Sequence, residues 1–181
     1  MIATLRGPRL DLRPLRDGDE PLYGQLYGDP GVMQHIGPAQ DAGTAARSFL
    51  TALRYNAAAA PVRVFWVIQD RAATEPLGLI GLTLDHDAGG EVGVLLPDRH
   101  QGRGVATEAI AALADHAFLT LRLQNLHTRH PPGHALAAGL MTTLGFERIA
   151  AAAGAGRWRW QLTPERWAAR PRRLSAADPL T

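Results

Sequence analysis

Alternating apolar and polar residues near the start of the chain predict a first strand. In the segment RLDLRPL, Leu10, Leu12 and Leu15 are separated by polar residues and a proline, and a period of two is typical of a strand with one buried face. Two helical segments follow, over residues 17–29 and 41–56. The first has a proline near its start and ends at the sequence Gly-Asp-Pro, which is a usual way to stop a helix.

Three strand-like segments come next, with short connections between them. They are VRVFWVIQ (62–69), PLGLIGLTLDH (76–86) and EVGVLLP (91–97), and all are rich in β-branched or bulky apolar residues. Connections this short predict an antiparallel meander.

After residue 104 the apolar period changes to that of a helix. An apolar face recurs at Val105, Ile110, Leu113, Ala117 and Leu121. We then expect a strand at 125–129, a helix at 134–146 closed by a glycine C-cap, and an antiparallel hairpin from residues 147–153 and 156–162. This order predicts one α/β domain over residues 1–170, with a mixed, mostly antiparallel sheet and about four helices. We expect the tail, 171–181, to be flexible.

Composition removes several classes of protein. The 181 residues include 46% hydrophobic and 20% charged side chains and no cysteine, which indicates a globular domain without disulfides or thiolate sites. The basic residues are all arginines, and the formal net charge is only +2, so a nucleic-acid partner is disfavoured. An apolar run long enough to span a bilayer and a signal-peptide pattern are both missing, so we expect a cytoplasmic protein without a membrane partner.

The segment EVGVLLPDRHQGRGVATEA carries the clearest chemical signal. It predicts a strand, a loop containing Gly102 and Gly104, and the N-terminus of a helix. Backbone amides turned to one side at the positive end of a helix can bind a diphosphate, with Arg103 and Thr107 as further donors. Thr107 occupies the third glycine position of a dinucleotide fingerprint, and the chain has no lysine for a P-loop. Both of those nucleotide folds are therefore excluded.

The same residues resemble a known family. Gln101-Gly102-Arg103-Gly104-Val105-Ala106 resembles the acetyl-CoA signature of the GNAT N-acetyltransferases, and its surroundings are similar to the RimJ/RimL branch, which acetylates ribosomal-protein N-termini. The start RGPRLDLRPL, the segment NLHTRHPPGHALAAGLMTTLGF and the end RWRWQLTPERW are also similar to that branch.

This resemblance implies a fold, a reaction and a set of cofactor contacts. The central sheet would be splayed, and acetyl-CoA would give its acetyl group to a primary amine by direct attack, without a metal. Backbone groups of the strand at Val94, Leu95 and Leu96 would pair with pantetheine, as an added strand pairs with a sheet edge. Gln101, Gly102, Arg103, Gly104, Val105, Ala106 and Thr107 would hold the diphosphate, and a strand amide would stabilise the oxyanion.

The chain departs from the family before its last long helix. The asparagine and serine that the family places there are His134 and Ala137 in this chain, and the tyrosine that protonates the thiolate in other branches is absent. His134 could contact pantetheine and serve as the general acid, or it could simply begin the helix, with water protonating the thiolate. The first candidate for a general base is Glu91, at the start of the strand that leads to the loop. An ordinary strand-end carboxylate is an equal interpretation of Glu91, and Asp85 and His86 are weaker candidates.

Other side chains have less specific interpretations. Glu108 suits the first turn of a helix, and Trp158 and Trp160 share a strand face that favours core packing. The acceptor would be a peptide N-terminus or a small amine, bound near Tyr23, Tyr27, Met33 and His35 of the N-terminal helices. A non-catalytic acyl-CoA sensor of the same fold is the alternative function, and the arginine-rich end is the only feature that favours a nucleic-acid regulator. The sequence does not decide whether the chain forms a homodimer.

Overall fold

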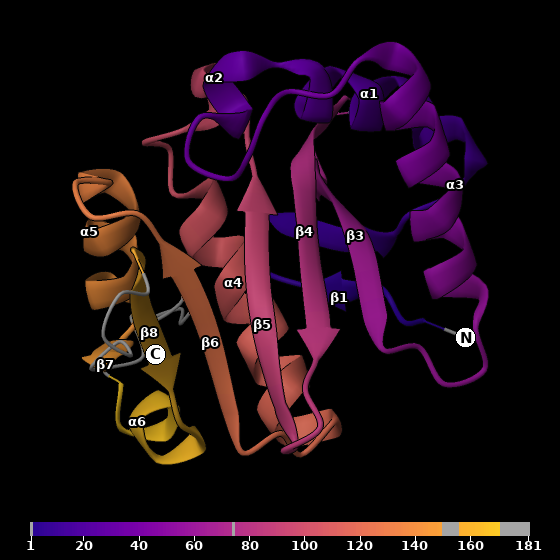
Figure 1. Cartoon of the computed structure of the whole chain (residues 1–181). Coiled ribbons are helices and arrows are strands. Elements are labelled where there is room, and N and C mark those ends of the chain that lie inside the picture. Colours follow the sequence, from indigo (N-terminus) through magenta and orange to yellow (C-terminus); the bar gives the residue numbers. More distant parts are fainter. Residues whose placement is uncertain (1, 74, 150–155, 171–181) are drawn as a thin grey trace.

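The computed structural model describes residues 2–73, 75–149 and 156–170, and in them one eight-stranded sheet forms the centre of the molecule (Figure 1). Its spatial order is β1-β2-β3-β4-β5-β6-β8-β7. Neighbouring strands are antiparallel except for β5 and β6, which are parallel. The strands are β1 (Leu5–Arg6), β2 (Leu10–Pro14), β3 (Arg63–Asp70), β4 (Pro76–Leu84), β5 (Gly89–Leu95), β6 (Asn125–His130), β7 (Glu147–Ile149) and β8 (Trp158–Leu162).

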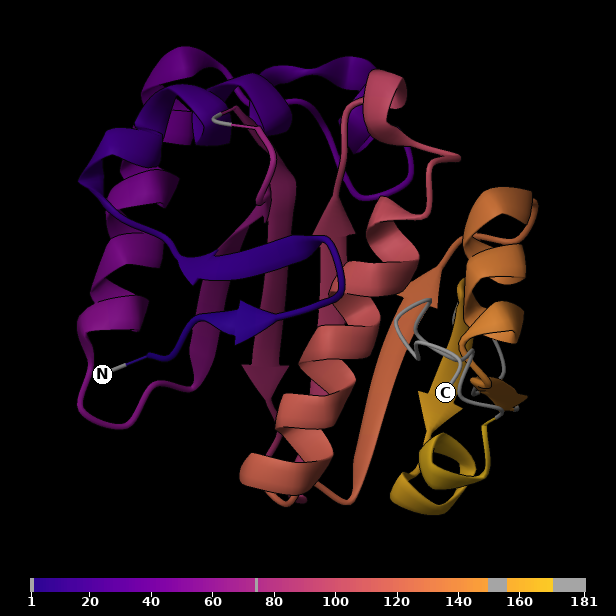
Figure 2. The ribbon, with the colours of Figure 1, turned by 180° about the vertical axis from the view of Figure 1, so that it is seen from behind.

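Helices cover both faces of this sheet. They are α1 (Glu20–Gly28), α2 (Pro30–Met33), α3 (Ala42–Ala57), α4 (Val105–Asp115), α5 (Ala135–Thr143) and α6 (Pro164–Ala169), and α4 continues into a π-helical turn, His116–Thr120. α1, α2 and α3 lie on one side of the sheet (Figure 1), whereas α4 and α5 lie on the other, as the view from behind shows (Figure 2).

Local sequence signals explain where several helices begin. The Asp41 carboxylate accepts a hydrogen bond from the Thr44 amide at 2.8 Å and caps α3, and Asp29 accepts from the Gly31 amide at 2.7 Å ahead of Pro30 in α2. An aspartate that accepts an amide of the first turn, with proline at the first helical position, is a strong start signal. α2 therefore forms immediately after α1 ends.

Two apolar cores match the two helical layers. The larger one joins β-strand residues such as Val92 and Leu126 to Ile110 and Leu113 of α4. The smaller one joins Leu95 of β5 and residues of β3 and β4 to the buried faces of α1 and α3. Because alternate residues of a strand face opposite sides, Glu91, Gly93 and Leu95 point to the α1–α3 side of the sheet. Val92 points to the α4 side.

The predicted elements agree with the structure in most places. The first strand, the meander, the helix after residue 104 and the last helix-and-hairpin segment all form, and β8 lies between β6 and β7. Trp160 is buried, and Trp158 packs against the same larger core, as the core interpretation predicted. The strand expected at 147–153 is described only to Ile149, and residues 150–153 and the tail 171–181 lie outside the described residues.

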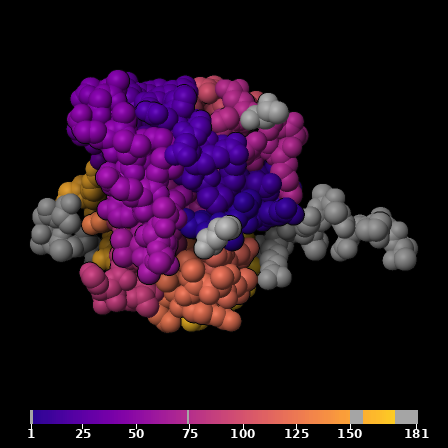
Figure 3. Space-filling view, turned by 90° about the vertical axis from the view of Figure 1, so that its right-hand side faces the viewer, coloured from indigo at the N-terminus to yellow at the C-terminus, as the bar shows by residue number. Residues whose placement is uncertain are grey.

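Three elements were missed, and the predicted helix count was low. β1 has two residues, too few to show a period. α2 is a single turn that begins at Pro30, where the prediction ended the preceding helix, and α6 begins at Pro164 after a Thr163 cap. Figure 3 shows the indigo N-terminal residues and α3 on one side of the molecule, above the orange residues of α4. Within the described residues, the structure contains no helix with the length and apolar character that crossing a membrane requires.

Candidate active site

The parallel strands β5 and β6 are paired at one end only. Three register pairs join them, Gly89 to Asn125, Gly90 to Leu126 and Glu91 to His127. β5 continues to Leu95 and β6 to His130, but the two strands diverge there (Figure 1). We call the last pairs, residues 89–91 and 125–127, the apex of the splay. Beyond the apex, the facing edges of β5 and β6 leave backbone groups that an extended ligand can pair with.

The glycine loop lies directly beyond the open end of β5. Gly102 has φ +69° and Gly104 has φ +77°, a left-handed conformation that glycine adopts without the steric cost of a side chain. Gly104 is the N-cap of α4, and its carbonyl accepts the Glu108 amide at 3.0 Å. The amides of the first helical turn have no acceptor within the helix. Together with the dipole of the 11-residue α4, these free amides give residues 102–107 the geometry that anion binding at a helix N-terminus requires.

Glu108 fixes this loop to the N-terminal hairpin, in line with its structural interpretation. Its carboxylate accepts hydrogen bonds from the backbone amides of Arg9 and Leu10, the latter at 2.8 Å, and from Arg9 Nε at 3.0 Å. The side chain of Glu108 is only 11% exposed. Arg9 Nη2 reaches the carbonyl of Arg103 at 3.4 Å. The first turn of α4 is thus held by contacts with residues almost a hundred positions earlier.

The surroundings of the loop are positively charged. Partial burial, together with the charges of Arg99 and Arg103, lowers the pKa of His100, against a smaller opposite effect of Glu75.

The Gln101 side chain donates to the Leu96 carbonyl at 3.1 Å and to Asp98 at 3.0 Å. Gln101 therefore shapes the turn between β5 and the loop, while the exposed glycines leave the backbone amides accessible.

At the apex, Glu91 forms a bidentate ion pair with Arg129 of β6. Arg129 Nε donates to one oxygen at 3.1 Å, and Nη2 donates to the other at 2.7 Å. Burial raises the pKa of the Glu91 carboxyl, but the hydrogen bonds and charge of Arg129, helped by His127 and Arg159, outweigh it, and the net pKa is lowered. The carboxylate lies on the α1–α3 side of the apex, is ionised at neutral pH and has both oxygens engaged.

His134 lies at the start of α5, and its side chain makes no capping hydrogen bond. Its ring instead stacks on His35, with centroids 3.9 Å apart, and meets His130 edge-on at 5.7 Å. Burial, followed by the proximity of His35 and His130, lowers the pKa of His134. The segment after α2 thereby contacts the β6–α5 half of the molecule, where Arg157 also donates to the Ile36 carbonyl at 3.1 Å.

The expected acceptor residues divide into two groups. Tyr23 and Met33 are 3% and 4% exposed and belong to the smaller core, so they support the fold and are unable to line an open pocket. Tyr27 stacks on Tyr23 at 4.3 Å, and burial is the largest cause that raises its pKa. His35 is half-buried against His134. The N-terminal helices were expected to supply four acceptor contacts, and two of those side chains are structural.

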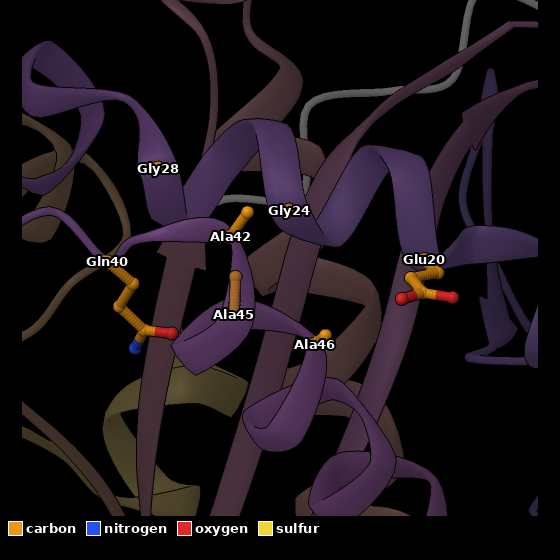
Figure 4. A pocket seen from close by; sticks show the side chains of 7 residues that line it. All are labelled: Glu20, Gly24, Gly28, Gln40, Ala42, Ala45 and Ala46. Atoms are coloured by element: carbon orange, nitrogen blue, oxygen red, sulfur yellow. The ribbon is translucent and has the colours of Figure 1, made fainter.

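A shallow hollow of about 360 Å³ lies between α1 and α3 (Figure 4). Its walls are mainly small residues, Gly24, Gly28, Ala42, Ala45 and Ala46, with Glu20 and Gln40 at the ends. These residues belong to the helical layer and not to the splayed strands, so the hollow has no part in the site at β5 and β6. Across the described residues, no group of three or more His, Asp or Glu side chains has an arrangement suited to a metal ion.

The structure adds three residues that the sequence pattern did not single out for the site, Arg9, His127 and Arg129, and it gives Asp85 a partner. Arg9 lies beside the loop, and Asp85 and His127 meet at the apex, where Nδ1 of His127 is 3.4 Å from Oδ2 of Asp85. Asp85 was considered only as a base in its own right. His127 and Arg129 are two residues apart in the strand and share the face opposite Leu126. That face could have been predicted from the alternation along a strand, but the partners of the two side chains could not.

Comparison with known proteins assigns the family. Residues 9–147 match the family model described as an acetyltransferase (GNAT) domain. Over 151 residues the chain is 27% identical to the uncharacterized N-acetyltransferase p20 of Bacillus licheniformis, with 81% of this chain and 84% of that protein covered.

Solved structures show the same fold. An acetyltransferase from Agrobacterium tumefaciens is 28% identical with a TM-score of 0.75, covering 90% of this chain and 95% of that one. The spermidine N-acetyltransferase from Vibrio cholerae, solved with CoA and spermine, is 19% identical with a TM-score of 0.75, covering 88% of this chain and 98% of that one. The chain described here belongs to the GNAT acetyltransferase family, and it is an acetyltransferase with acetyl-CoA as its co-substrate.

Proposed function

We propose that this acetyltransferase moves the acetyl group of acetyl-CoA to a primary amine, by direct attack of the amine in a ternary complex. The observation that carries the proposal is the position of the splay. β5 and β6 part immediately beyond residues 91 and 127, and the open end of β5 leads into a left-handed glycine loop at the N-terminus of α4. One extended ligand with an anionic end fits this combination of a free strand edge and an anion site.

Acetyl-CoA would lie along β5 with its diphosphate at the loop. The amides of Gly102 to Thr107, with Arg103 and the Thr107 hydroxyl, would bind the diphosphate, while Val105 and Ala106 form the helical turn beneath it. Backbone groups of Val94, Leu95 and Leu96 would pair with the pantetheine arm. Each residue of a strand advances the chain by about 3.3 Å. If the pantetheine arm reaches one or two residues past Val94 toward the apex, the thioester would lie roughly 3–7 Å from Val94 and close to the apex.

The amine would approach from the α1–α3 side of the sheet. Gly93 faces that side and is exposed, and a side chain added there would meet no atom within 4 Å. The thioester would therefore be accessible next to Gly93. For the acceptor we propose a peptide N-terminus, as in the RimJ/RimL branch, or a small amine of the kind that the Vibrio cholerae enzyme is named for.

Acid and base catalysis would be divided between the two ends of this region. Glu91, at the apex, is the proton acceptor predicted from the sequence, and His134, at the N-terminus of α5, is the predicted donor to the leaving thiolate. His134 suits a donor at neutral pH in one respect, because its lowered pKa keeps the ring neutral with one N–H still present. The acceptor amine must lose its ammonium proton before it can attack.

Two measurements test the function. Calorimetry with acetyl-CoA should give a saturable signal for the full chain. Release of free thiol should then be followed with a panel of acceptors that includes spermidine and peptides beginning with serine or alanine. Turnover with at least one amine, and the acetylated amine as product by mass spectrometry, is the expected result. Binding of acetyl-CoA without transfer to any amine would contradict the proposal and leave a protein that only binds the thioester.

A further inference from the structure

The histidine at the apex lies next to an aspartate. His127 is 4% exposed, and its buried Nδ1 has no hydrogen bond but lies 3.4 Å from Oδ2 of Asp85. A carboxylate next to Nδ1 favours the tautomer with the proton on that nitrogen. The lone pair is then on Nε2, the nitrogen that can accept a proton from another molecule.

The backbone makes room for this pair. Asp85 follows β4, and its amide donates to the carbonyl of Gly89 at 2.9 Å. A Cβ atom at Gly89 would lie 3.1 Å from Oδ2 of Asp85 and 2.9 Å from Oδ1 of Asn125. A side chain at Gly89 would therefore force the Asn125 side chain to move and would press on the carboxylate that faces His127. The glycine at this position permits the Asp85–His127 contact.

Glu91 is poorly suited to the role that the sequence gives it. Both of its oxygens accept hydrogen bonds from Arg129, and this ion pair lowers the pKa of the carboxyl and so weakens Glu91 as a proton acceptor. His127 is its register partner across the apex, on the same face of the sheet. The amine that reaches the thioester beside Gly93 therefore has Glu91 and His127 as neighbours at the apex. The Glu91 carboxylate is held in an ion pair with Arg129, whereas Nε2 of His127 forms no ion pair.

We infer that His127, oriented by Asp85, accepts the ammonium proton of the acceptor, and that Glu91 serves to hold Arg129. This inference rests on the proposed function and replaces Glu91 as the base. The ammonium gives one proton to Nε2, directly or through a water molecule, and the neutral amine forms the C–N bond at the thioester carbonyl. When the C–S bond breaks, the nitrogen loses its second proton, the thiolate takes up one proton, and one proton in total is released to solvent as His127 is deprotonated.

Charges from every neighbouring strand act on His127. Burial is the largest effect and lowers its pKa, Arg159 of β8 and Arg129 of β6 lower it further, and Asp85 and Glu91 oppose them. The net direction is downward, so the ring is neutral at pH 7 and available as a base. A general base is most effective when it is unprotonated at the working pH but still basic enough to take a proton.

The decisive measurement is the pH dependence of kcat/KM from pH 5 to 9, with the amine that gives the fastest thiol release among spermidine and serine or alanine peptides. Without an enzyme base only the neutral amine reacts, so a plot of log kcat/KM against pH rises with a slope of one throughout this range. When a base on the free enzyme takes the proton of the bound ammonium, the plot rises with a slope of one only below the pKa of that base and bends to a plateau above it. We expect this bend in the wild type and in Glu91→Gln, and its loss in His127→Asn, with kcat/KM lowered about 100-fold at pH 7.5.

Asp85→Asn provides a second, milder variant that does not alter the buried ring. It should lower kcat/KM about tenfold and move the bend to lower pH, because a charge that raises the pKa of His127 is removed. Unchanged calorimetric binding of acetyl-CoA in each variant would show that the fold and the loop are intact.

Two results would overturn the inference in different ways. If Glu91→Gln removes the bend and His127→Asn or Asp85→Asn leaves it unchanged, Glu91 is the base and the proposed function stands. If the wild type binds acetyl-CoA and transfers the acetyl group to no amine, the proposed function fails and the role of His127 fails with it.

Discussion

The glycine loop and the apex of the splay place their functional atoms in different ways. At residues 102–107 those atoms are backbone amides, and their positions follow from two left-handed glycines and the start of α4. At the apex they are side chains, Asp85, Glu91, His127 and Arg129, which come from three adjacent strands or their ends. A backbone site is encoded by a short contiguous segment. A side-chain site depends on the register between segments that are far apart in sequence.

The first prediction tests whether the loop depends on its backbone. Gly104→Val should weaken acetyl-CoA binding about 100-fold, because a β-branched residue is strained at φ +77°. Calorimetry gives the dissociation constant. Gly139→Ala, in α5 where an added Cβ meets nothing within 4 Å, is the matched control and should bind normally. Equal affinities for the two variants would show that the loop does not hold the cofactor.

A second prediction concerns the support of the loop. Glu108→Ala should reduce the free energy of unfolding by about 2 kcal/mol, because two backbone amides of the N-terminal hairpin lose their acceptor. For a chain of this size that corresponds to a fall in Tm of roughly 4–8 °C. Glu147→Ala removes an exposed carboxylate that pairs with Arg166 at 3.3 Å and should change Tm little. If both variants melt like the wild type, the hairpin is held by other contacts.

The third prediction moves to the side chains beyond the apex. His134→Ala should lower kcat about tenfold and leave the affinity for acetyl-CoA nearly unchanged. The effect is modest for an acid because a thiolate, with a pKa of about 8.5, leaves readily without one. Steady-state kinetics separate kcat from KM, and the exposed His86→Ala serves as control. A tenfold loss of affinity at constant kcat would instead make His134 a pantetheine contact.

The smallest effect is expected from the ion pair at the apex. The pKa of Glu91 in the folded chain is below its ordinary value of 4.5. Its pair with Arg129 therefore stabilises the fold above that pH, and the contribution disappears as the pH falls through the lowered pKa. The side chain is one-third exposed, so the gain over Glu91→Gln should stay under about 1 kcal/mol. Tm differences at pH 7 and pH 3.5 test this, and a difference that grows in acid would reverse the sign.

The same contrast explains which parts of the structure could be predicted from the sequence. Gly102, Gly104 and the change of apolar period at residue 104 are local signals, and the loop, α4 and the meander could be predicted from them. Tyr23 and Met33 were assigned to a pocket because an apolar helix face shows that a residue is buried but does not identify what covers it. The Glu91–Arg129 and Asp85–His127 contacts join residues separated by about forty positions. They depend on the parallel register of β5 and β6, which no local pattern specifies.

The short parallel pairing of β5 and β6 also has a consequence for stability. Three register pairs connect β1–β5 to β6, β8 and β7, and beyond them the hydrogen bonds of the two edges would be completed by the pantetheine arm itself. Bound acetyl-CoA would then take the place of a strand between β5 and β6 and close the seam between the two parts of the sheet. Amide hydrogen exchange in β6 and at the end of β5 should slow when the cofactor is present. Product release would reopen that seam to water in every catalytic cycle.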